Sequence, residues 1–490
     1  MTQGAQAVRA GDAVSGVSQA PLWGLGKVIA LEHPELHTVC FDLDPTGALA
    51  PQAAALCAQL LAPAAEAREA QLALRQERLH VARLRRFAWQ PTESALGIVT
   101  GQASATYLIT GGLGGLGLLV ARWLVEQGAR HLVLVGRSQP KAAMQRQLDQ
   151  LAARGVTVRI AQADVADFAQ MTHVLQTIDP RHPLRGIIHA AGVLEDAALL
   201  HQSWARFSKV LSPKILGAWH LHELTKDRPL DFFVLFSSAT SLFGRAGQAN
   251  HAAANAFLDA FAHYRHSQHL PALSISWGAW SEVGAAAALG QREQQRLATN
   301  GQSFIPPEQG IQALAGLLEQ DVAHVAVIPL DWTKFLKGLP APTAFFADFT
   351  TQHLAAILPA TAESPQTRLE DSDFLAQLRK INPAKRKARL NDYLVRQIAQ
   401  ILHYEPLFPL NPQSPLTALG LDSLMSIELK NWIGRELKIN LPVITLLDAS
   451  VEELTTRLAD ELLRTEMALP GGSAGHATET SEETIEEFTV

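Results

Sequence analysis

The 490-residue sequence contains only two cysteines, Cys40 and Cys57, too few for a disulfide framework or a cysteine-based metal cluster. We therefore predict no metal site and expect both cysteines to be reduced, small core residues. Charged residues are also scarce, at 18% of the chain against a typical value of about 25%, while 47% of residues are apolar. This composition excludes wholesale disorder.

Excess positive charge and long apolar runs are missing as well. The 41 basic and 47 acidic residues give a net charge of −6, so no overall basic field attracts nucleic acid. No segment approaches the roughly 20 uninterrupted apolar residues of a membrane helix. The first residues lack the basic-then-apolar profile of a signal peptide. We predict a cytoplasmic protein that binds neither nucleic acid nor membrane.

Short β-rich runs alternate with helical lengths between residues 96 and 335. They are TYLIT, HLVLVG, VTVRIAQ, GIIHA, FFVLFSS, ALSISW and HVAVIPL. Such alternation predicts an α/β fold with a doubly wound, Rossmann-type parallel sheet. Residues 1–95 show a weaker α/β pattern, with extended runs at 37–44 and 79–87 around an Ala-rich helical stretch at 52–76.

The rest of the chain divides by composition into three parts. Residues 336–388 contain Pro, Thr and Asp without clear periodicity, which predicts a linker. Residues 389–466 have a purely helical pattern and predict a small all-α bundle. Residues 467–490 combine a Gly/Ser break with an acidic tail.

A glycine-rich segment follows the TYLIT run and precedes a helical stretch. Glycines at a strand-to-helix turn let a pyrophosphate approach the amides of the helix N-terminus, where the dipole favours an anion. The segment fits both G-x-G-x-x-G and T-G-x-x-x-G-x-G. The predicted cofactor-binding residues of this turn are Thr110, Gly111, Gly112, Gly114, Gly115 and Gly117.

The residues after the next two strands indicate which dinucleotide binds. An NAD-preferring site usually has a carboxylate after the second strand, but here Arg137 takes that place, which favours the 2′-phosphate of NADPH. A plain surface arginine is the alternative. Asp164 and Val165 follow the third strand and are expected to hold the adenine; the alternative for Asp164 is a local cap.

Four segments are similar in sequence to the ketoreductase domain of modular polyketide synthases, a branch of the short-chain dehydrogenases. They are HAAG at 189–192, VLSPKILGAWHLH at 210–222, FVLFSS at 233–238 and HAAANAFLDA at 251–260. The resemblance covers about residues 1–335. It implies NADPH-dependent reduction of a β-ketoacyl thioester, in which a Ser and a Tyr hold the carbonyl, the Tyr gives the proton and a Lys lowers the phenol pKa.

One position departs from the family's catalytic set. By position, Lys214, Ser238 and Asn255 take the lysine, serine and asparagine roles. His251 stands where the family has its tyrosine. Its ring is shorter than a phenol, and like charge from Lys214 disfavours its protonated form. Because a donor misplaced by about an ångström can cost on the order of 10²-fold in rate, we predict an inactive or impaired ketoreductase.

The segment Leu194-Glu195-Asp196 resembles the L-x-D element of B-type ketoreductases, and Phe243 stands where A-type members carry Trp. If reduction occurs, this resemblance implies the B-type hydroxyl configuration. The alternative for Asp196 is an ordinary loop carboxylate.

The motif GLDSL at 420–424 is similar to the G-x-D-S-L of acyl carrier proteins, a resemblance that covers about residues 390–465. A serine at a helix N-terminus is often only a cap. Here Asp422 and the flanking leucines favour the modified serine of that family. The resemblance implies that a phosphopantetheinyl transferase attaches 4′-phosphopantetheine to Ser423, and that the arm carries the acyl chain.

Both ends of the chain imply partners. Residues 4–45 look like the later part of the degenerate Rossmann half that precedes the catalytic half in this family, so we expect an upstream synthase domain or subunit to complete its sheet. We expect the tail from about Thr478 to dock a downstream synthase subunit, although a solvated tail is the alternative. Its acidic residues are Glu479, Glu482, Glu483, Glu486 and Glu487, interleaved with Ile485, Phe488 and Val490.

Two functions from different classes follow. The first is the end of a polyketide synthase module, an NADPH-type ketoreductase impaired at His251 and fused to a carrier. The second is a non-reducing structural pseudo-ketoreductase, in which only Ser423 is functional. A free-standing dehydrogenase of small metabolites is disfavoured by the fused carrier.

Overall fold

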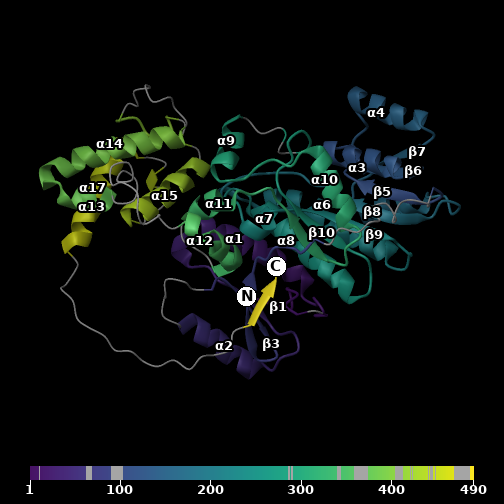
Figure 1. Cartoon of the computed structure of the whole chain (residues 1–490), viewed down its shortest axis with the longest axis horizontal. Helices are drawn as coiled ribbons and strands as arrows, with labels where there is room; N and C mark the ends of the chain where they lie inside the picture. The colour runs from purple at the N-terminus through teal and green to yellow at the C-terminus, as the bar shows by residue number, and fades with distance from the viewer. Residues whose placement is uncertain are drawn as a thin grey trace. The chain divides into compact units, whose positions relative to one another are not determined.

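The computed structural model (Figure 1) describes residues 1–9, 11–61, 69–89, 103–284, 287, 291–338, 344–357, 374–402, 412–419, 421, 423–439, 441, 445–446, 449–467 and 486–489. The chain divides into two compact units. Unit 1 comprises residues 1–338, 342–353 and 484–490, and unit 2 comprises residues 339–341 and 354–483.

A seven-stranded, all-parallel sheet forms the centre of unit 1, with strand order β11-β10-β9-β8-β5-β6-β7. Every strand coincides with one of the β-rich runs of the sequence. The strands are β5 (Thr106–Thr110), β6 (His131–Gly136), β7 (Thr157–Gln162), β8 (Leu184–His189), β9 (Phe232–Ser238), β10 (Leu273–Trp277) and β11 (His324–Val327).

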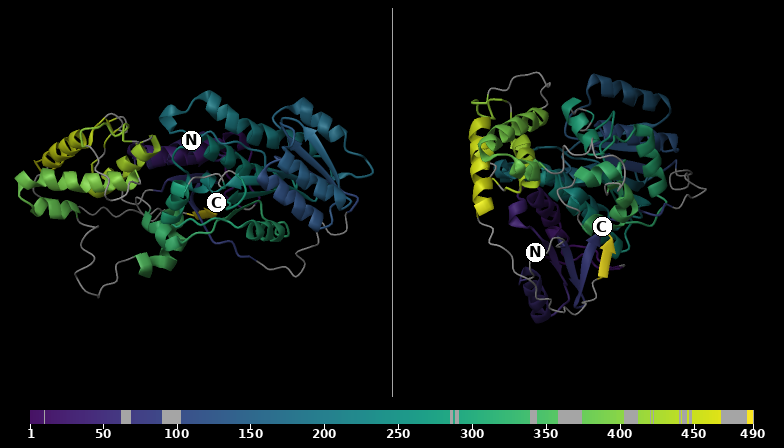
Figure 2. Two further views of the ribbon diagram at one scale, coloured as in Figure 1. Left: turned by 90° about the horizontal axis from the view of Figure 1, so that it is seen from above. Right: turned by 60° about the vertical axis from the view of Figure 1, so that its left-hand side comes forward.

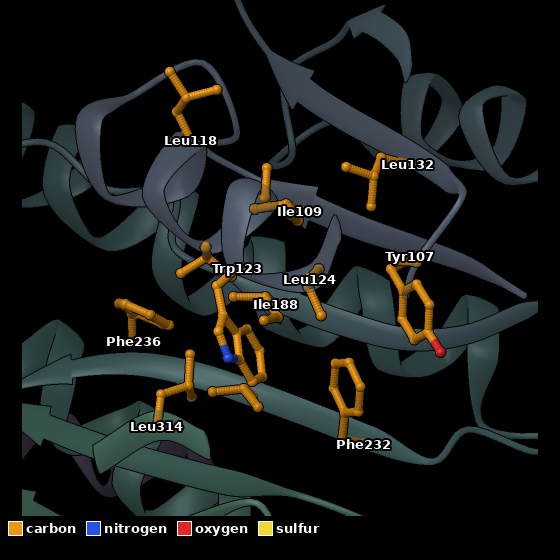
Figure 3. Packing of buried hydrophobic residues seen from close by; sticks show 14 of the residues in the cluster. Tyr107, Ile109, Leu118, Trp123, Leu124, Leu132, Ile188, Phe232, Phe236 and Leu314 are labelled. Atoms are coloured by element: carbon orange, nitrogen blue, oxygen red, sulfur yellow. The ribbon is translucent and has the colours of Figure 1, made fainter. Parts of the chain in front are cut away.

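Helices cover both faces of this sheet. On one face the core takes buried side chains from α3 (Gly115–Glu126), α4 (Ala142–Ala153) and α10 (Pro307–Leu317), as Figure 3 shows for Leu118, Trp123 and Leu314. On the other face it takes them from α5 (Phe168–Gln176), α6 (Trp204–Thr225) and α8 (Ala249–Ser267). The predicted doubly wound, Rossmann-type sheet is therefore confirmed. The remaining helices of this region are α7 (Thr240–Phe243), α9 (Gln291–Thr299) and α11 (Trp332–Gly338).

A second, smaller sheet precedes the first along the chain, with strand order β1-β2-β3-β4-β12. Its strands are β1 (Thr2–Gln3), β2 (Cys40–Leu43), β3 (Gln71–Arg75), β4 (Arg78–Arg83) and β12 (Glu486–Thr489). β1, β2 and β3 are parallel, and β4 runs antiparallel to β3. α1 (Pro21–Glu32) and α2 (Leu49–Leu61) complete this half. The expected helix at 52–76 was too long, because 71–75 is a buried strand between β2 and β4.

α1 packs directly on α8, the helix that carries His251 and Asn255. A carbon added at Gly24 would lie 2.2 Å from the Ala252 carbonyl oxygen, so glycine is needed at this backbone contact. At the C-terminal end of α1 the Glu32 side chain is 1% exposed. The half without a nucleotide signature is therefore part of the packing around the site.

Two further expectations differ from the structure. The segment 336–388, expected as an irregular linker, contains α12 (Ala347–Ile357), α13 (Phe374–Lys380) and the start of α14 (Pro383–Ile401). Phe345 and Phe346 of this segment are buried. The sequence did not indicate this, because its apolar residues here have no helical period. Cys57 is exposed, because it lies on the outer face of α2.

Unit 2 is a helical bundle of α13, α14, α15 (Ser423–Leu437) and α17 (Val451–Met467) around one apolar core. Leu394, Ile398, Leu429 and Leu454 are fully buried in that core. The all-α bundle expected after the sheet is therefore present. Across the described ranges of both units, no helix is long and apolar enough to cross a membrane.

Candidate active site and carrier site

The glycine-rich segment forms the turn between β5 and α3. Gly111 has φ of 66°, a left-handed conformation that favours glycine. A carbon added at Gly117 would lie 2.3 Å from the Gly111 carbonyl oxygen, so a side chain there would push α3 off the turn. Gly114 precedes α3 and provides no side-chain cap. The first amides of the helix, from Gly115 on, thus fit a phosphate group.

His189, at the end of β8, connects this turn to α6. The Thr110 hydroxyl donates to His189 Nδ1 at 2.7 Å, and His189 Nε2 donates to the Lys214 carbonyl oxygen at 3.3 Å. Because a carbonyl only accepts, Nε2 carries a proton, and the lowered pKa keeps the ring neutral, so that Nδ1 accepts from Thr110. Burial, followed by the charge of Lys214, lowers the pKa of His189 to about 3. Sequence reasoning gave His189 no role, since its neighbours at the turn and on α6 are distant in sequence.

Lys214 lies in the middle of α6 and is 5% exposed. Its ammonium donates to the Phe236 carbonyl oxygen at 2.8 Å, which holds it against the end of β9. Burial lowers the pKa of Lys214 to about 8, and the charge of Asp259 opposes the shift. Lys214 is therefore a buried cation at neutral pH. Its ammonium is bound at Phe236, two residues before Ser238 on β9.

His251 and Asn255 occupy successive turns of α8. The Asn255 amide donates to the His251 carbonyl oxygen at 2.8 Å, and Ser237 next to Ser238 donates to the Asn255 carbonyl oxygen at 3.3 Å. Burial and then the charges of Lys214 and Arg245 lower the pKa of His251 to about 3. Its Nδ1 is buried without a hydrogen-bond partner, as is Asn255 Oδ1. The four residues assigned from sequence thus lie around the C-terminal end of β9.

The residues expected to select the dinucleotide lie at the ends of β6 and β7. Arg137 is exposed directly after β6. Asp164 follows β7, and its carboxylate accepts from the Ala166 amide at 2.9 Å, so it caps its own turn, which was the alternative named for it. Val165 is 4% exposed, and its carbonyl oxygen contacts His220 Nδ1 at 3.3 Å.

The loop with Leu194 and Asp196 is fastened to the start of α8. Gln248 donates from Nε2 to the Asp196 carboxylate at 2.8 Å, and the Ala197 amide donates to the Gly247 carbonyl oxygen at 2.8 Å. Leu194 is 40% exposed. Asp196 is therefore bound to the segment that leads into His251 and is more than an isolated surface carboxylate.

Glu32 from α1 connects the same two segments. Its carboxylate accepts from the Leu199 amide at 2.6 Å and from the Gly247 amide at 2.8 Å. Nothing in the local sequence distinguishes Glu32 from the last residue of an ordinary helix. The structure thus adds a positioning residue that comes from the half of unit 1 without a nucleotide signature.

Neither described tyrosine of unit 1, Tyr107 or Tyr264, takes the place of the family's tyrosine. Tyr264 packs against Trp219 and Phe261 with ring centroids 5.8 Å apart, and Tyr107 is buried in β5. Phe243 packs against Phe335 at a centroid distance of 5.3 Å.

In unit 2, Ser423 is the first residue of α15. A turn precedes it, in which the Leu421 amide donates to the Leu416 carbonyl oxygen at 2.9 Å. Leu421 and Leu416 are both buried in the core of the bundle. The buried Leu421, two residues before Ser423, therefore anchors this turn to the core of the bundle, and Asp422 lies outside the described residues.

Three family descriptions match separate parts of the chain. The KR domain matches residues 105–282, and the Rossmann fold domain of the polyketide synthase extender module SpnB matches residues 1–84. The phosphopantetheine attachment site matches residues 392–458. KR domains use NADPH and phosphopantetheine attachment domains carry that group covalently, so the predicted cofactors are those of the matched families.

Curated relatives are polyketide synthases. Polyketide synthase GfsB of Streptomyces halstedii is 35% identical over 469 residues, which are 91% of this chain and 8% of the relative. The pikromycin polyketide synthase component PikAIII of Streptomyces venezuelae is 34% identical over 455 residues, which are 91% of this chain and 28% of the relative. The chain therefore spans a small part of the length of these proteins.

A solved A1-type ketoreductase is 38% identical, with a TM-score of 0.63 over 72% of this chain and 74% of that structure. The fold, the glycine-rich turn and the helical unit with Ser423 agree with these likenesses. The chain belongs to the modular polyketide synthases and contains a ketoreductase domain followed by a phosphopantetheine attachment domain.

Proposed function

We propose that unit 1 binds NADPH but reduces its β-ketoacyl thioester slowly, and that unit 2 holds the acyl chain on phosphopantetheine. The observation that carries this proposal is the state of His251. Its pKa of about 3 keeps the ring neutral at every physiological pH, so the residue in the tyrosine place holds no surplus proton.

The cofactor part of the proposal rests on the turn before α3 and on Arg137. The uncapped helix amides suit the pyrophosphate, and the exposed guanidinium after β6 suits a 2′-phosphate. NADPH supplies the hydride when it is bound. We also assign Thr110, Asp164 and Val165 to the cofactor-binding site. Asp164 would contribute by holding the turn after β7, because its carboxylate accepts from the Ala166 amide.

Proton supply is the step at which this site differs from its family. Reduction adds a hydride to the carbonyl carbon and a proton to the oxygen, and Ser238 can hold that oxygen by a hydrogen bond. A neutral His251 that gave up its ring proton would become an imidazolate, a far stronger base than a phenolate. Lys214 is a cation below pH about 8, but its ammonium is directed to the Phe236 carbonyl. The proton therefore has no efficient donor among these side chains.

One observation favours the non-reducing alternative. His251 Nδ1 and Asn255 Oδ1 are both buried without a hydrogen-bond partner among the described protein groups, so no described protein group hands a proton to either atom. In that case the Rossmann-type region is a scaffold and Ser423 is the functional residue of the chain. If reduction occurs, we propose the B-type configuration, because Asp196 is tied to the segment before His251.

Partners follow from the carrier. We propose that a phosphopantetheinyl transferase modifies Ser423 at the start of α15, and that upstream synthase domains deliver the acyl chain. We also propose a downstream subunit as a partner of the acidic tail, and a cytoplasmic location.

The domain bounds proposed are 1–95, 96–335, 336–388, 389–466 and 467–490.

The test is reduction of a β-ketoacyl-thioester surrogate by the holo protein, followed as loss of NADPH absorbance and by product analysis. We expect His251→Tyr to raise the rate by on the order of 10²–10⁴-fold, the usual contribution of a positioned acid. His251→Phe, which has a ring but no donor, should stay as slow as the natural protein. Brisk turnover by the natural protein that His251→Phe abolishes would instead make histidine the donor.

A further inference from the structure

The C-terminal tail contributes a strand to the small sheet of unit 1. β12 pairs in parallel with β4, in a register that places Glu486 opposite His80 and Thr489 opposite Arg83. Figures 1 and 2 show this yellow strand at the edge of the small sheet, whose strands are coloured purple to blue. Residues 486–489 of the tail, for which we expected either docking to a downstream subunit or a solvated state, are thus paired within their own chain.

We infer that the outer edge of β4 is a strand-addition site, and that its occupant is the chain's own segment 486–489, bound in cis. This pairing does not depend on the reduction chemistry. It gives the tail a resting place on unit 1, from which any other partner of the tail must displace it.

The backbone of β4 is suited to this role. An edge strand presents unpaired amide and carbonyl groups, and strand addition satisfies them by main-chain hydrogen bonds. β4 is already fixed on its other side by β3, in a register that pairs Leu72 with Val81. Val81 is 1% exposed and packs with Phe41, Leu72 and Leu74. The edge is therefore rigid before the tail arrives, which lowers the entropic cost of adding a strand.

Charge favours this occupant. The β4 region carries Arg78, Arg83, Arg85 and Arg86. Two acidic side chains offset part of this charge, because Glu69 pairs with Arg83 and Asp348 pairs with Arg85. The sequence from Thr478 onward has five glutamates and no basic residue. Residues 78–86 contain these four arginines and no acidic residue, and Glu77 precedes them, so the stretch has a net positive charge that attracts the acidic tail, and salt should weaken that attraction.

The connection to unit 2 favours pairing within one chain. α17 ends at Met467 and β12 begins at Glu486, so 18 residues (468–485) join them. Such a segment can span up to roughly 60 Å, at about 3.3 Å per residue. Because the segment joins β12 to the rest of the chain covalently, pairing with β4 is an intramolecular step whose extent does not depend on protein concentration. Pairing in cis should therefore prevail over exchange between chains.

The experiment is amide hydrogen exchange of residues 80–83 in the full-length holo protein. We expect Phe488→Pro, which removes an amide donor from the middle of β12, to accelerate exchange of the outward-facing β4 amides at least tenfold. Deletion of 484–490 should have the same effect. Thr480→Pro, outside the paired residues, is the matched control and should leave exchange unchanged. Unchanged tryptophan-monitored unfolding will show that the variants fold.

A second measurement distinguishes the occupants. A peptide spanning 476–490, added to the deletion variant, should restore protection only at high concentration, whereas protection in the full chain should not vary with protein concentration. Amide exchange of residues 80–83 that stays unchanged in both Phe488→Pro and the deletion variant would overturn the inference. Protection that rises with protein concentration, together with dimers in sedimentation, would assign the edge to a second copy and overturn pairing in cis.

Discussion

Burial of His189 between the glycine-rich turn and α6 predicts a specific sensitivity to acid. The folded protein lowers the pKa of His189 to about 3, while an unfolded histidine titrates near its ordinary value of 6.5. Below pH 6.5 the unfolded state binds a proton that the folded state excludes. The free energy of unfolding therefore falls as the pH falls, from 6.5 down to about 3.

The size of the effect follows from these values. pH 5 lies 1.5 units below the pKa of 6.5 of the unfolded side chain. At about 1.4 kcal/mol per unit, protonation of the unfolded state therefore lowers the free energy of unfolding by about 2 kcal/mol. No discount for solvent screening applies, because His189 is 1% exposed. The lowered pKa values of His222, His251, His263 and His324 act with the same sign, so a substitution is needed to isolate His189.

Urea unfolding at pH 7, 6 and 5 provides the measurement. Tryptophan fluorescence reports on unit 1, because every tryptophan except Trp432 belongs to it. His189→Asn keeps an acceptor for Thr110 but cannot titrate, so it should lose about 2 kcal/mol less than the natural protein between pH 7 and 5. His173→Asn, at an exposed position on α5, is the control and should follow the natural protein. Equal losses in His189→Asn and the natural protein would refute a buried, neutral His189.

Three further predictions concern the two cofactors and the turn. Arg137→Ala should weaken NADPH binding roughly 10- to 100-fold in a fluorescence titration and leave NADH binding unchanged, since only the 2′-phosphate loses a charged partner; equal effects on both would contradict the assignment. Ser423→Ala should gain no mass from a phosphopantetheinyl transferase, whereas the exposed Thr417→Ala should gain it; a persistent arm would place the attachment elsewhere. Gly117→Ala should destabilise unit 1 by about 1–3 kcal/mol in urea unfolding, because its added carbon meets a backbone oxygen at 2.3 Å. Gly434→Ala, with its nearest atom at 3.8 Å, should leave that transition in place.

The large sheet could be predicted from sequence because its signals are local. Each strand from β5 to β11 is a run of β-branched and aromatic residues between turns, and central parallel strands read as continuous apolar runs. The small sheet was harder. The segment LALR within 71–75 favours a helix by propensity, but pairing with β2 and β4 makes it a strand.

The catalytic residues were assigned by position, yet their connections came from the structure. Glu32 is 167 residues from Leu199 and 215 from Gly247 in sequence, so no local pattern relates it to the loop before α8. His189 is joined in the same way to Thr110, 79 residues earlier. Contacts of this kind depend on the crossover topology of the sheet. A single sequence shows the residues but not which of them meet.

His251 shows how the two kinds of reasoning combine. The sequence identifies the position at which a phenol is replaced, but histidine in solution is a competent acid near neutral pH, so identity alone leaves the rate open. The structure holds His251 half-buried on α8, with its Nδ1 atom buried and the charge of the buried Lys214 acting on it, and both effects favour the neutral form. Removing Lys214 would relieve only the smaller of the two causes. Substitution of Lys214 should therefore leave His251 a poor acid, and we expect a change of residue 251 itself, as in His251→Tyr, to be needed to raise the rate of reduction.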